Sequence, residues 1–138
     1  MIKLSSDGPI VMVDDNAGDR FFVERCFDAS KISKERNPWL ACAHGLEFLA
    51  MLEQVKAGQL PMPALVLLDL NMPGMNGLDV LSVVRADQSF NELPVFCVLT
   101  SSHDPRDAQA AERLHASGFV TKASSMQEYV SFFDELVS

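Results

Sequence analysis

The sequence predicts an α/β fold, a doubly wound parallel sheet with helices on both faces, and three observations support this prediction. Four apolar runs recur along the 138-residue chain, and the first three do not alternate apolar with polar residues. Segments with helical periodicity separate these runs. A weaker fifth run completes a pattern in which strand and helix alternate five times. Continuous apolar strands are typical of a parallel sheet buried on both faces, and strict alternation is typical of doubly wound domains.

The predicted strands are short apolar runs with helical segments between them. They cover residues 9–13, 64–68, 94–99 and 118–120, and residues 39–43 form the weaker candidate. In a doubly wound sheet, ligands bind outside the carboxyl ends of the strands, where the strand order reverses. The residues that follow each apolar run are therefore the first place to look for chemistry.

Each predicted helix carries an apolar stripe with the period of 3.6 residues. Asp104 followed by Pro105 predicts an N-cap and a first-turn proline, and residues 124–128 have the spacing of a capping box. The stripes comprise Phe22, Cys26 and Phe27; Phe48, Leu49, Leu52 and Val55; Leu78, Leu81 and Val84; Ala108, Ala111 and Leu114; and Met126, Tyr129, Val130, Phe133, Leu136 and Val137.

Length and composition narrow the class of protein. A chain that is 48% hydrophobic and 22% charged buries enough apolar surface to fold, which excludes a disordered chain. No apolar run approaches the ~20 residues of a membrane span, and the first residues lack the features of a signal peptide. We expect a cytoplasmic protein with no membrane contact. One domain is expected over residues 1–138, with its core at about 9–137.

The net charge and the cysteines exclude further classes. A net charge of −8 offers no clustered cations for phosphate backbones, so we expect no nucleic-acid partner. Cys26, Cys42 and Cys97 have neither a CxxC pair nor the spacing of a zinc site. All three lie within apolar stretches, where a thiol packs as a small hydrophobic side chain.

Polar residues capable of chemistry lie at or just past the ends of four of the predicted strands. Asp14 and Asp15 follow the first run, Asp69 the run at 64–68, Thr100 the next run, and Lys122 the last. Each of these residues alone has an ordinary structural explanation, such as a helix cap, a strand-end acid or a solvated lysine. Parallel strands bring all of them to one edge of the sheet, and this joint placement predicts a site.

The charges at this edge predict the chemistry of the site. Two carboxylates ~4 Å apart repel by about 4 kcal/mol at an effective dielectric constant near 20, so three need a cation. An all-oxygen site with few protein ligands suits Mg²⁺, which favours a phosphate as co-ligand. Lys122 adds an ammonium and Thr100 a hydroxyl, and these groups together stabilise a phosphoryl group on a carboxylate.

At these residues the sequence resembles the response-regulator receiver domain, in its standalone, chemotaxis-regulator-like form. The matching segments are VDDN at 13–16, LLDLNMPGMNG at 67–77, VLTS at 98–101 and GFVTK at 118–122. The resemblance covers roughly residues 9–137 and implies a sheet of order 2-1-3-4-5 with five helices. It leaves no residues for an output domain, so the signal is expected to pass by contact with a downstream protein.

The resemblance also implies roles for individual residues. Asp69 is expected to accept a phosphoryl group from the phosphohistidine of a sensor histidine kinase or phosphotransfer protein. Asp14 and Asp15 are expected to bind Mg²⁺ together with Asp69 and the backbone carbonyl of Asn71. The protein is then a phosphoacceptor of a two-component system or phosphorelay, and it catalyses only its own phosphorylation and dephosphorylation.

The remaining features of the resemblance concern switching and the family subgroup. Thr100 and Lys122 are similar to the pair that holds the phosphoryl oxygens, and Phe119 occupies the position of an aromatic residue that rotates on activation. Ala123 stands where the family usually has proline, so the conformation of the Lys122–Ala123 bond is open. The small residue after Lys122, together with the long stretch at 101–107, resembles the standalone receivers that partner bacterial phytochrome-type kinases. Receivers of that subgroup are often dimeric through the last helices, so a homodimer is a possible assembly.

Two other classes of function fit the sequence less well. A phosphorylation-independent adaptor would use the same fold as a docking surface, but none of the receiver residues is missing. A small flavodoxin-like enzyme or flavin carrier would place an anionic phosphate beside three acids, which electrostatics disfavours.

Overall fold

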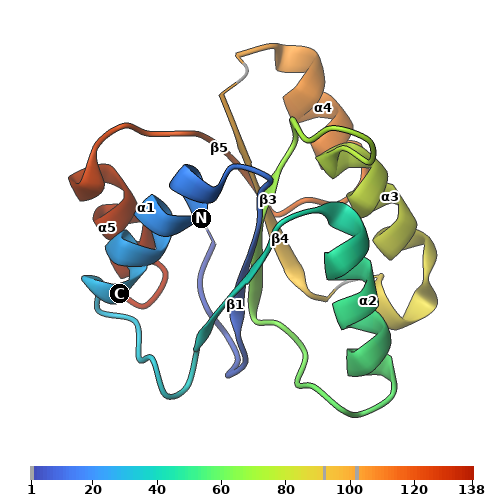
Figure 1. The fold of residues 1–138 in the computed structure, drawn as a ribbon, viewed down its shortest axis with the longest axis horizontal. Coiled ribbons are helices and arrows are strands. Elements are labelled where there is room, and N and C mark those ends of the chain that lie inside the picture. The colour runs from blue at the N-terminus through green and yellow to red at the C-terminus, as the bar shows by residue number, and fades with distance from the viewer. Residues whose placement is uncertain (1, 92, 102) are drawn as a thin grey trace.

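The fold is a parallel sheet between two layers of helices, as the sequence predicts (Figure 1). The computed structural model describes residues 2–91, 93–101 and 103–138. All strand pairs are parallel, and the strand order is β2-β1-β3-β4-β5. The strands are β1 (Ile10–Val13), β2 (Trp39–Cys42), β3 (Leu65–Asp69), β4 (Val95–Thr100) and β5 (Gly118–Thr121). The helices are α1 (Ala17–Asp28), α2 (Gly45–Lys56), α3 (Gly77–Ala86), the 3₁₀ helix η1 (Gln88–Phe90), α4 (Pro105–Arg113) and α5 (Met126–Glu135).

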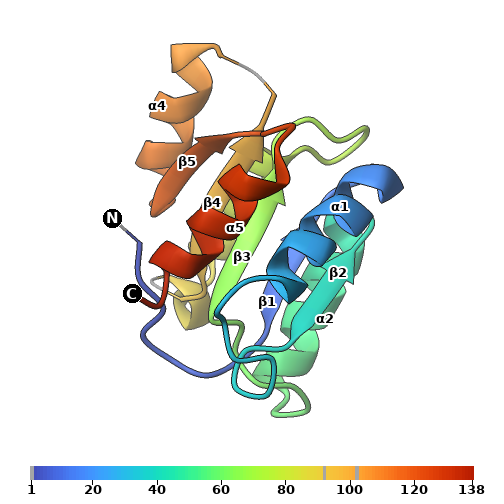
Figure 2. The ribbon, with the colours of Figure 1, turned by 90° about the vertical axis from the view of Figure 1, so that its left-hand side faces the viewer.

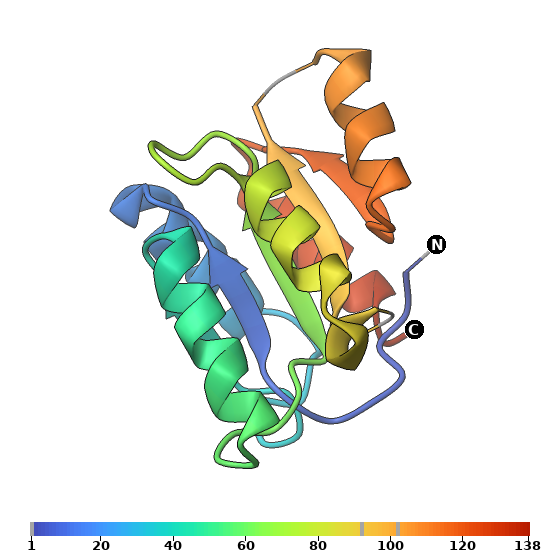
Figure 3. The same ribbon diagram turned by 90° about the vertical axis from the view of Figure 1, so that its right-hand side faces the viewer.

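The two helical layers are different in size. Helices α1 and α5 lie side by side on one face of the sheet (Figure 2), and α2, α3 and α4 cover the other face (Figure 3). The central strands β1 and β3 are buried along their whole length, which agrees with their continuous apolar sequences. The loops that follow β1, β3, β4 and β5 gather at one edge of the sheet, at the top of Figure 1.

Aromatic rings fill the layer beneath α1 and α5. Phe27 lies with its ring centroid 5.1 Å from that of Trp39 and 5.6 Å from that of Phe133. On the opposite face, Phe48 of α2 contacts Phe96 of β4 with centroids 6.0 Å apart. The three cysteines are free and buried, which confirms that they belong to the core.

The helix starts confirm one sequence prediction and correct another. Asp104 caps α4 by accepting a hydrogen bond from the Arg106 N–H, and Pro105 occupies the first turn. The predicted capping box at 124–128 is wrong, because Ser125 precedes α5 without a side-chain cap hydrogen bond. The turn is tied instead by Tyr129, whose hydroxyl accepts a hydrogen bond from the Ala123 N–H at 3.2 Å.

The apolar stripe of α5 is shorter than the sequence predicts. Tyr129, Phe133 and Leu136 are buried, whereas Met126 and Val137 at its two ends are each 45% exposed. No helix in the described residues combines the length and the hydropathy that crossing a bilayer requires.

Candidate functional site

The predicted site residues lie together at the carboxyl edge of the sheet. Asp69 ends β3, Thr100 ends β4 and Lys122 directly follows β5. Close packing at Gly77, the first residue of α3, brings that helix against the end of β3. A Cβ at this position would lie 2.4 Å from the Asp69 carbonyl oxygen, so only glycine fits there.

Three carboxylates form an acidic cluster at this edge. One oxygen from each of Asp14, Asp15 and Asp69 lies within 4.8 Å of the other two. Asp14 is fully buried and Asp69 is 3% exposed, whereas Asp15 faces solvent. Asp14 Oδ1 accepts a hydrogen bond from the Asn16 N–H, and its buried Oδ2 lies 2.9 Å from the Lys122 ammonium. Buried carboxylates are costly without nearby positive charge, and carboxylate oxygens are the usual ligands of hard divalent cations.

The Lys122 ammonium is shared among three carboxylates. Its Nζ lies 2.9 Å from Asp14 Oδ2, 2.9 Å from Asp19 Oδ2 and 3.6 Å from Asp69 Oδ2. The contact with Asp19 is a hydrogen bond that the ammonium donates. Burial acts to lower the pKa of Lys122, but hydrogen bonds to Asp19 and Asp14 and the nearby negative charges raise it on balance.

Asn71 connects the acidic cluster to the end of β4. Its backbone N–H donates to Asp69 Oδ1 at 3.2 Å, and its side-chain Nδ2 donates to the Thr100 hydroxyl oxygen at 3.1 Å. The Lys122 N–H donates to the Thr100 carbonyl at 2.7 Å, which fixes the end of β5 against β4. The Lys122–Ala123 peptide bond is trans.

The surroundings of Asp69 strongly disturb its ionisation. Burial, followed by the negative charge of Asp14, raises the pKa of Asp69 to about 6, even though Lys122 acts in the opposite direction. An ionised Asp69 is therefore costly without a positively charged ligand. The donor set, three carboxylates whose oxygens lie close together, fits a hard divalent cation such as Mg²⁺.

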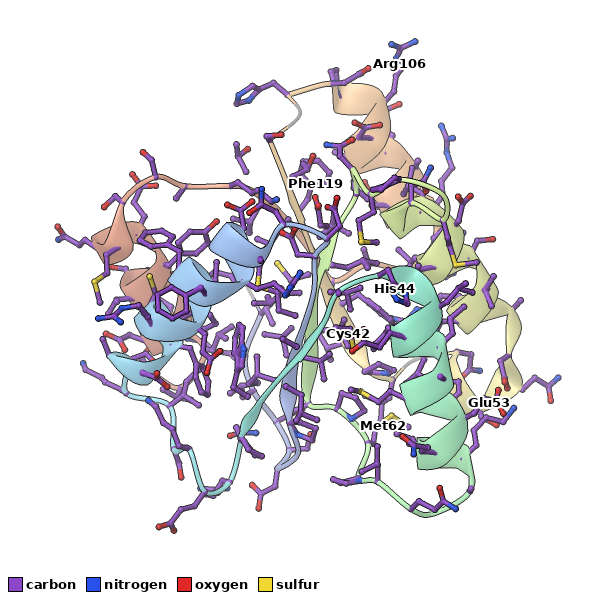
Figure 4. All side chains as sticks on the ribbon, viewed as in Figure 1. Cys42, His44, Glu53, Met62, Arg106 and Phe119 are labelled. Atoms are coloured by element: carbon purple, nitrogen blue, oxygen red, sulfur yellow. The ribbon has the colours of Figure 1, made fainter. Side chains whose placement is uncertain are left out.

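Phe119 lies on β5, beside the site rather than within it. It pairs with Val98 of β4 and packs against a small cluster that also contains Leu70 and Ala111. It is half-buried and lines a cavity of about 320 Å³ between α4 and β5. Figure 4 labels Phe119 in the upper part of the sheet, well away from Met62 near its lower end.

Two contacts of the site were not predicted from the sequence. Asp19 reaches Lys122 from the first turn of α1, and the Asn71 side chain reaches Thr100. The only signal for Asp19 is its position, one helical turn after Asp15 on the helix that follows the acidic pair. For Asn71, the sequence predicted a role for the backbone carbonyl alone.

Comparison with known proteins gives a consistent result. Residues 10–133 match the family model described as the response regulator receiver domain. The chain is 32% identical over 120 residues to response regulator Rcp1 of Synechocystis sp. (strain ATCC 27184 / PCC 6803 / Kazusa), which covers 86% of this chain and 79% of that protein.

Solved structures agree with this family match. The Mn²⁺-bound form of response regulator Rcp1 is 28% identical with a TM-score of 0.77, covering 94% of this chain and 91% of that one. The bacteriophytochrome response regulator RtBRR is also 28% identical, with a TM-score of 0.76, and covers 99% of this chain and 78% of that one.

Proposed function

The chain belongs to the response regulator receiver domain family of two-component systems, and on that premise we propose that Asp69 is its phosphoacceptor. The phosphoryl group would come from the phosphohistidine of a sensor histidine kinase or a phosphotransfer protein. The observation that supports this role is the convergence of a buried Asp69 with two further acids and the Lys122 ammonium.

The arrangement around Asp69 suits nucleophilic attack by its carboxylate. Asp69 Oδ1 accepts a hydrogen bond from the Asn71 N–H, and Asp69 Oδ2 lies 3.6 Å from Lys122 Nζ. In the transfer, a carboxylate oxygen forms the new O–P bond as the P–N bond to the imidazole breaks, and the imidazole nitrogen keeps the electron pair and ends protonated. Lys122 and Thr100 would then hold the phosphoryl oxygens by an ion pair and a hydrogen bond.

Asp14, Asp15, Asp69 and the backbone carbonyl of Asn71 would hold Mg²⁺. When bound, the ion neutralises the negative charge that gathers at the carboxylates and the phosphoryl group. The clustered carboxylates of Asp14, Asp15 and Asp69 support this assignment. A similar protein, response regulator Rcp1, has a structure described as Mn²⁺-bound.

Thr100 and Phe119 would carry the signal from the site to the surface. Thr100 ends β4, and Phe119 pairs with Val98 two residues earlier on the same strand. Movement of the Thr100 hydroxyl toward a phosphoryl oxygen would shift a two-state equilibrium in which Phe119 packs differently beside α4. Because Phe119 lacks a hydroxyl group, this switching would depend on packing alone.

The remaining parts of the function follow from the family. The chain would act in the cytoplasm as a single receiver domain over residues 1–138 and signal by binding a downstream protein. It would catalyse only its own phosphorylation and dephosphorylation. Similarity to the bacteriophytochrome response regulator RtBRR supports a phytochrome-type kinase as the phosphodonor. The proposed assembly is a homodimer.

Intact-mass measurement tests the proposal directly. The protein is incubated with Mg²⁺ and a small phosphodonor such as acetyl phosphate, and a single phosphoryl adduct is expected. Asp69→Asn should remove the adduct, and Asp14→Asn should slow its formation, whereas Asp28→Asn at the exposed end of α1 should change neither. An unmodified wild-type protein, or an adduct that persists in Asp69→Asn, would refute the assignment.

A further inference from the structure

The Lys122 ammonium is held more closely by a residue outside the proposed phosphoacceptor site than by the phosphoacceptor. Its Nζ donates a hydrogen bond to Asp19 Oδ2 at 2.9 Å, and it lies 3.6 Å from Asp69 Oδ2. Both Asp14 and Asp69 belong to the acidic cluster that fits a metal, but Asp19 does not. The ammonium is therefore drawn toward α1 by a carboxylate that has no other assigned role.

The position of Asp19 is fixed by the start of α1. Its backbone N–H donates to the side chain of Asn16, the N-cap of the helix, at 2.9 Å. This capping bond sets the register of the first turn and directs the Asp19 side chain toward the end of β5. The Lys122 side chain is 19% exposed and that of Asp19 is 44% exposed, so their contact is partly desolvated.

Phosphorylation of Asp69 changes the competition for this ammonium. A carboxylate with one negative charge becomes an acyl phosphate that carries nearly two, with oxygens that reach further into the site. The lysine has three N–H donors on a flexible chain, so it can turn toward the new charge. Asp19 is the partner that Lys122 can release, because Asp14 stays buried within the metal cluster.

We propose that Asp19 is a positioning residue that holds the Lys122 ammonium on the α1 side of the site until a phosphoryl group displaces it. The inference rests on the proposed function of Asp69. Part of the attraction between Lys122 and the phosphoryl group is then used to break the Lys122–Asp19 contact. Asp19 thus limits how strongly the phosphoryl group stabilises the signalling state, and its side chain is released on the surface of α1 when the switch occurs.

A double-mutant cycle tests this role. Beryllium trifluoride, which mimics a phosphoryl group on a carboxylate, is titrated at saturating Mg²⁺ into the wild type, Asp19→Asn, Lys122→Met and the double variant. We expect Asp19→Asn to bind the mimic about fivefold more tightly, because the competing ion pair is gone. In the Lys122→Met background the same substitution should have no effect.

Two control variants separate the proposed contact from a general effect of charge. Glu24→Gln removes an exposed acid from the same helix, and it should leave the affinity unchanged. Asp19→Glu keeps the charge and should restore most of the wild-type affinity. An equal effect of Asp19→Asn with and without Lys122, or no effect at all, would overturn the proposal.

A measurement on the unphosphorylated protein separates this proposal from the proposed function. In ¹⁵N-labelled protein, the Lys122 ammonium should give a slowly exchanging NMR signal that weakens in Asp19→Asn, and a signal that Asp19→Asn leaves unchanged would refute the holding role. If the signal behaves as expected but the wild type binds no beryllium trifluoride, the assignment of Asp69 fails and the switching role of Asp19 fails with it.

Discussion

Two parts of strand β3 are equally buried but have opposite effects on stability. Leu65, Val66, Leu67 and Leu68 are at most 1% exposed and lie in the apolar core, and Asp69, the next residue, is 3% exposed. Burying each aliphatic side chain stabilises the fold by about 1.5–3 kcal/mol. Burying the carboxylate beside Asp14 instead raises its pKa and makes its ionised form unfavourable.

The apolar core and the acidic edge therefore have separate roles. Burial of the apolar core stabilises the folded state. Burial of the carboxylates at the acidic edge destabilises it, and a bound cation would reduce this cost. Substitutions in the core should therefore destabilise the protein, and substitutions in the acidic edge should stabilise it while removing function. Opposite signs of this kind are measurable.

The largest expected effect is in the aromatic core. Phe133 is fully buried against Phe27 and Trp39, so Phe133→Ala should lower the free energy of unfolding by about 3–5 kcal/mol. Phe132→Ala is the matched control. Because the neighbouring Phe132 is only half-buried, its removal should lower the free energy of unfolding much less. Urea unfolding measures both. Equal losses would mean that the core beneath α5 is not the main source of stability.

A substitution of the proposed phosphoacceptor should stabilise the protein. Asp69→Asn should raise the free energy of unfolding at pH 7 by about 2–3 kcal/mol in a metal chelator, because it removes an unfavourable buried charge. The folded-state pKa of about 6 lies above the usual value of about 3.9, so the folded protein binds protons more tightly than the unfolded chain between these values. Wild-type stability should therefore fall as the pH rises from about 4 to 6.

Urea unfolding of wild type, Asp69→Asn and Asp28→Asn across this pH range provides the measurement. The pH dependence should be much weaker in Asp69→Asn and unchanged in Asp28→Asn. If the stability of the wild type rises from pH 4 to 6 by as much as that of Asp69→Asn, ionising the buried carboxylate has no free-energy cost and the prediction is wrong.

The same comparison explains which features were predictable from the sequence. Buried apolar runs identify parallel strands, and parallel strands necessarily place Asp14, Asp69, Thr100 and Lys122 at one edge of the sheet. The contact between Lys122 and Asp19 was not predictable, because it depends on where two side chains from α1 and the end of β5 meet in space.

The start of α5 is a second feature that the local sequence did not predict correctly. Local spacing predicted a capping box at 124–128, but the Tyr129 hydroxyl makes a hydrogen bond with the Ala123 N–H, and Ser125 makes no cap bond. Sequence periodicity therefore located the helix, whereas contacts from within the folded helix determined how it begins.

A smaller effect is expected when a metal neutralises the acidic edge. Ligand binding stabilises the folded state by RT ln(1 + [L]/Kd), so Mg²⁺ at ten times its dissociation constant should add about 1.4 kcal/mol. Asp14→Asn should abolish this gain, because it removes a buried carboxylate of the acidic cluster that would hold the ion. Thermal unfolding with and without Mg²⁺ measures the difference, with Asp28→Asn as control. A Mg²⁺ effect that survives in Asp14→Asn would place the metal elsewhere.

The smallest effect on stability is expected at Phe119, where the core and the acidic edge meet. The ring is half-buried and faces a cavity, so Phe119→Leu should lower the free energy of unfolding by less than about 1 kcal/mol. Its effect on switching should be larger, because Phe119 pairs with Val98, two residues before Thr100 on β4.

Hydrogen exchange of α4 and β5, with and without beryllium trifluoride, measures that coupling. In wild type the mimic should change the protection of both elements, and in Phe119→Leu the change should be reduced while the affinity for the mimic stays within about twofold. A stability loss as large as that of Phe133→Ala would place Phe119 in the rigid core. An unchanged exchange response would show that the signal leaves the acidic edge by a route that does not involve this ring.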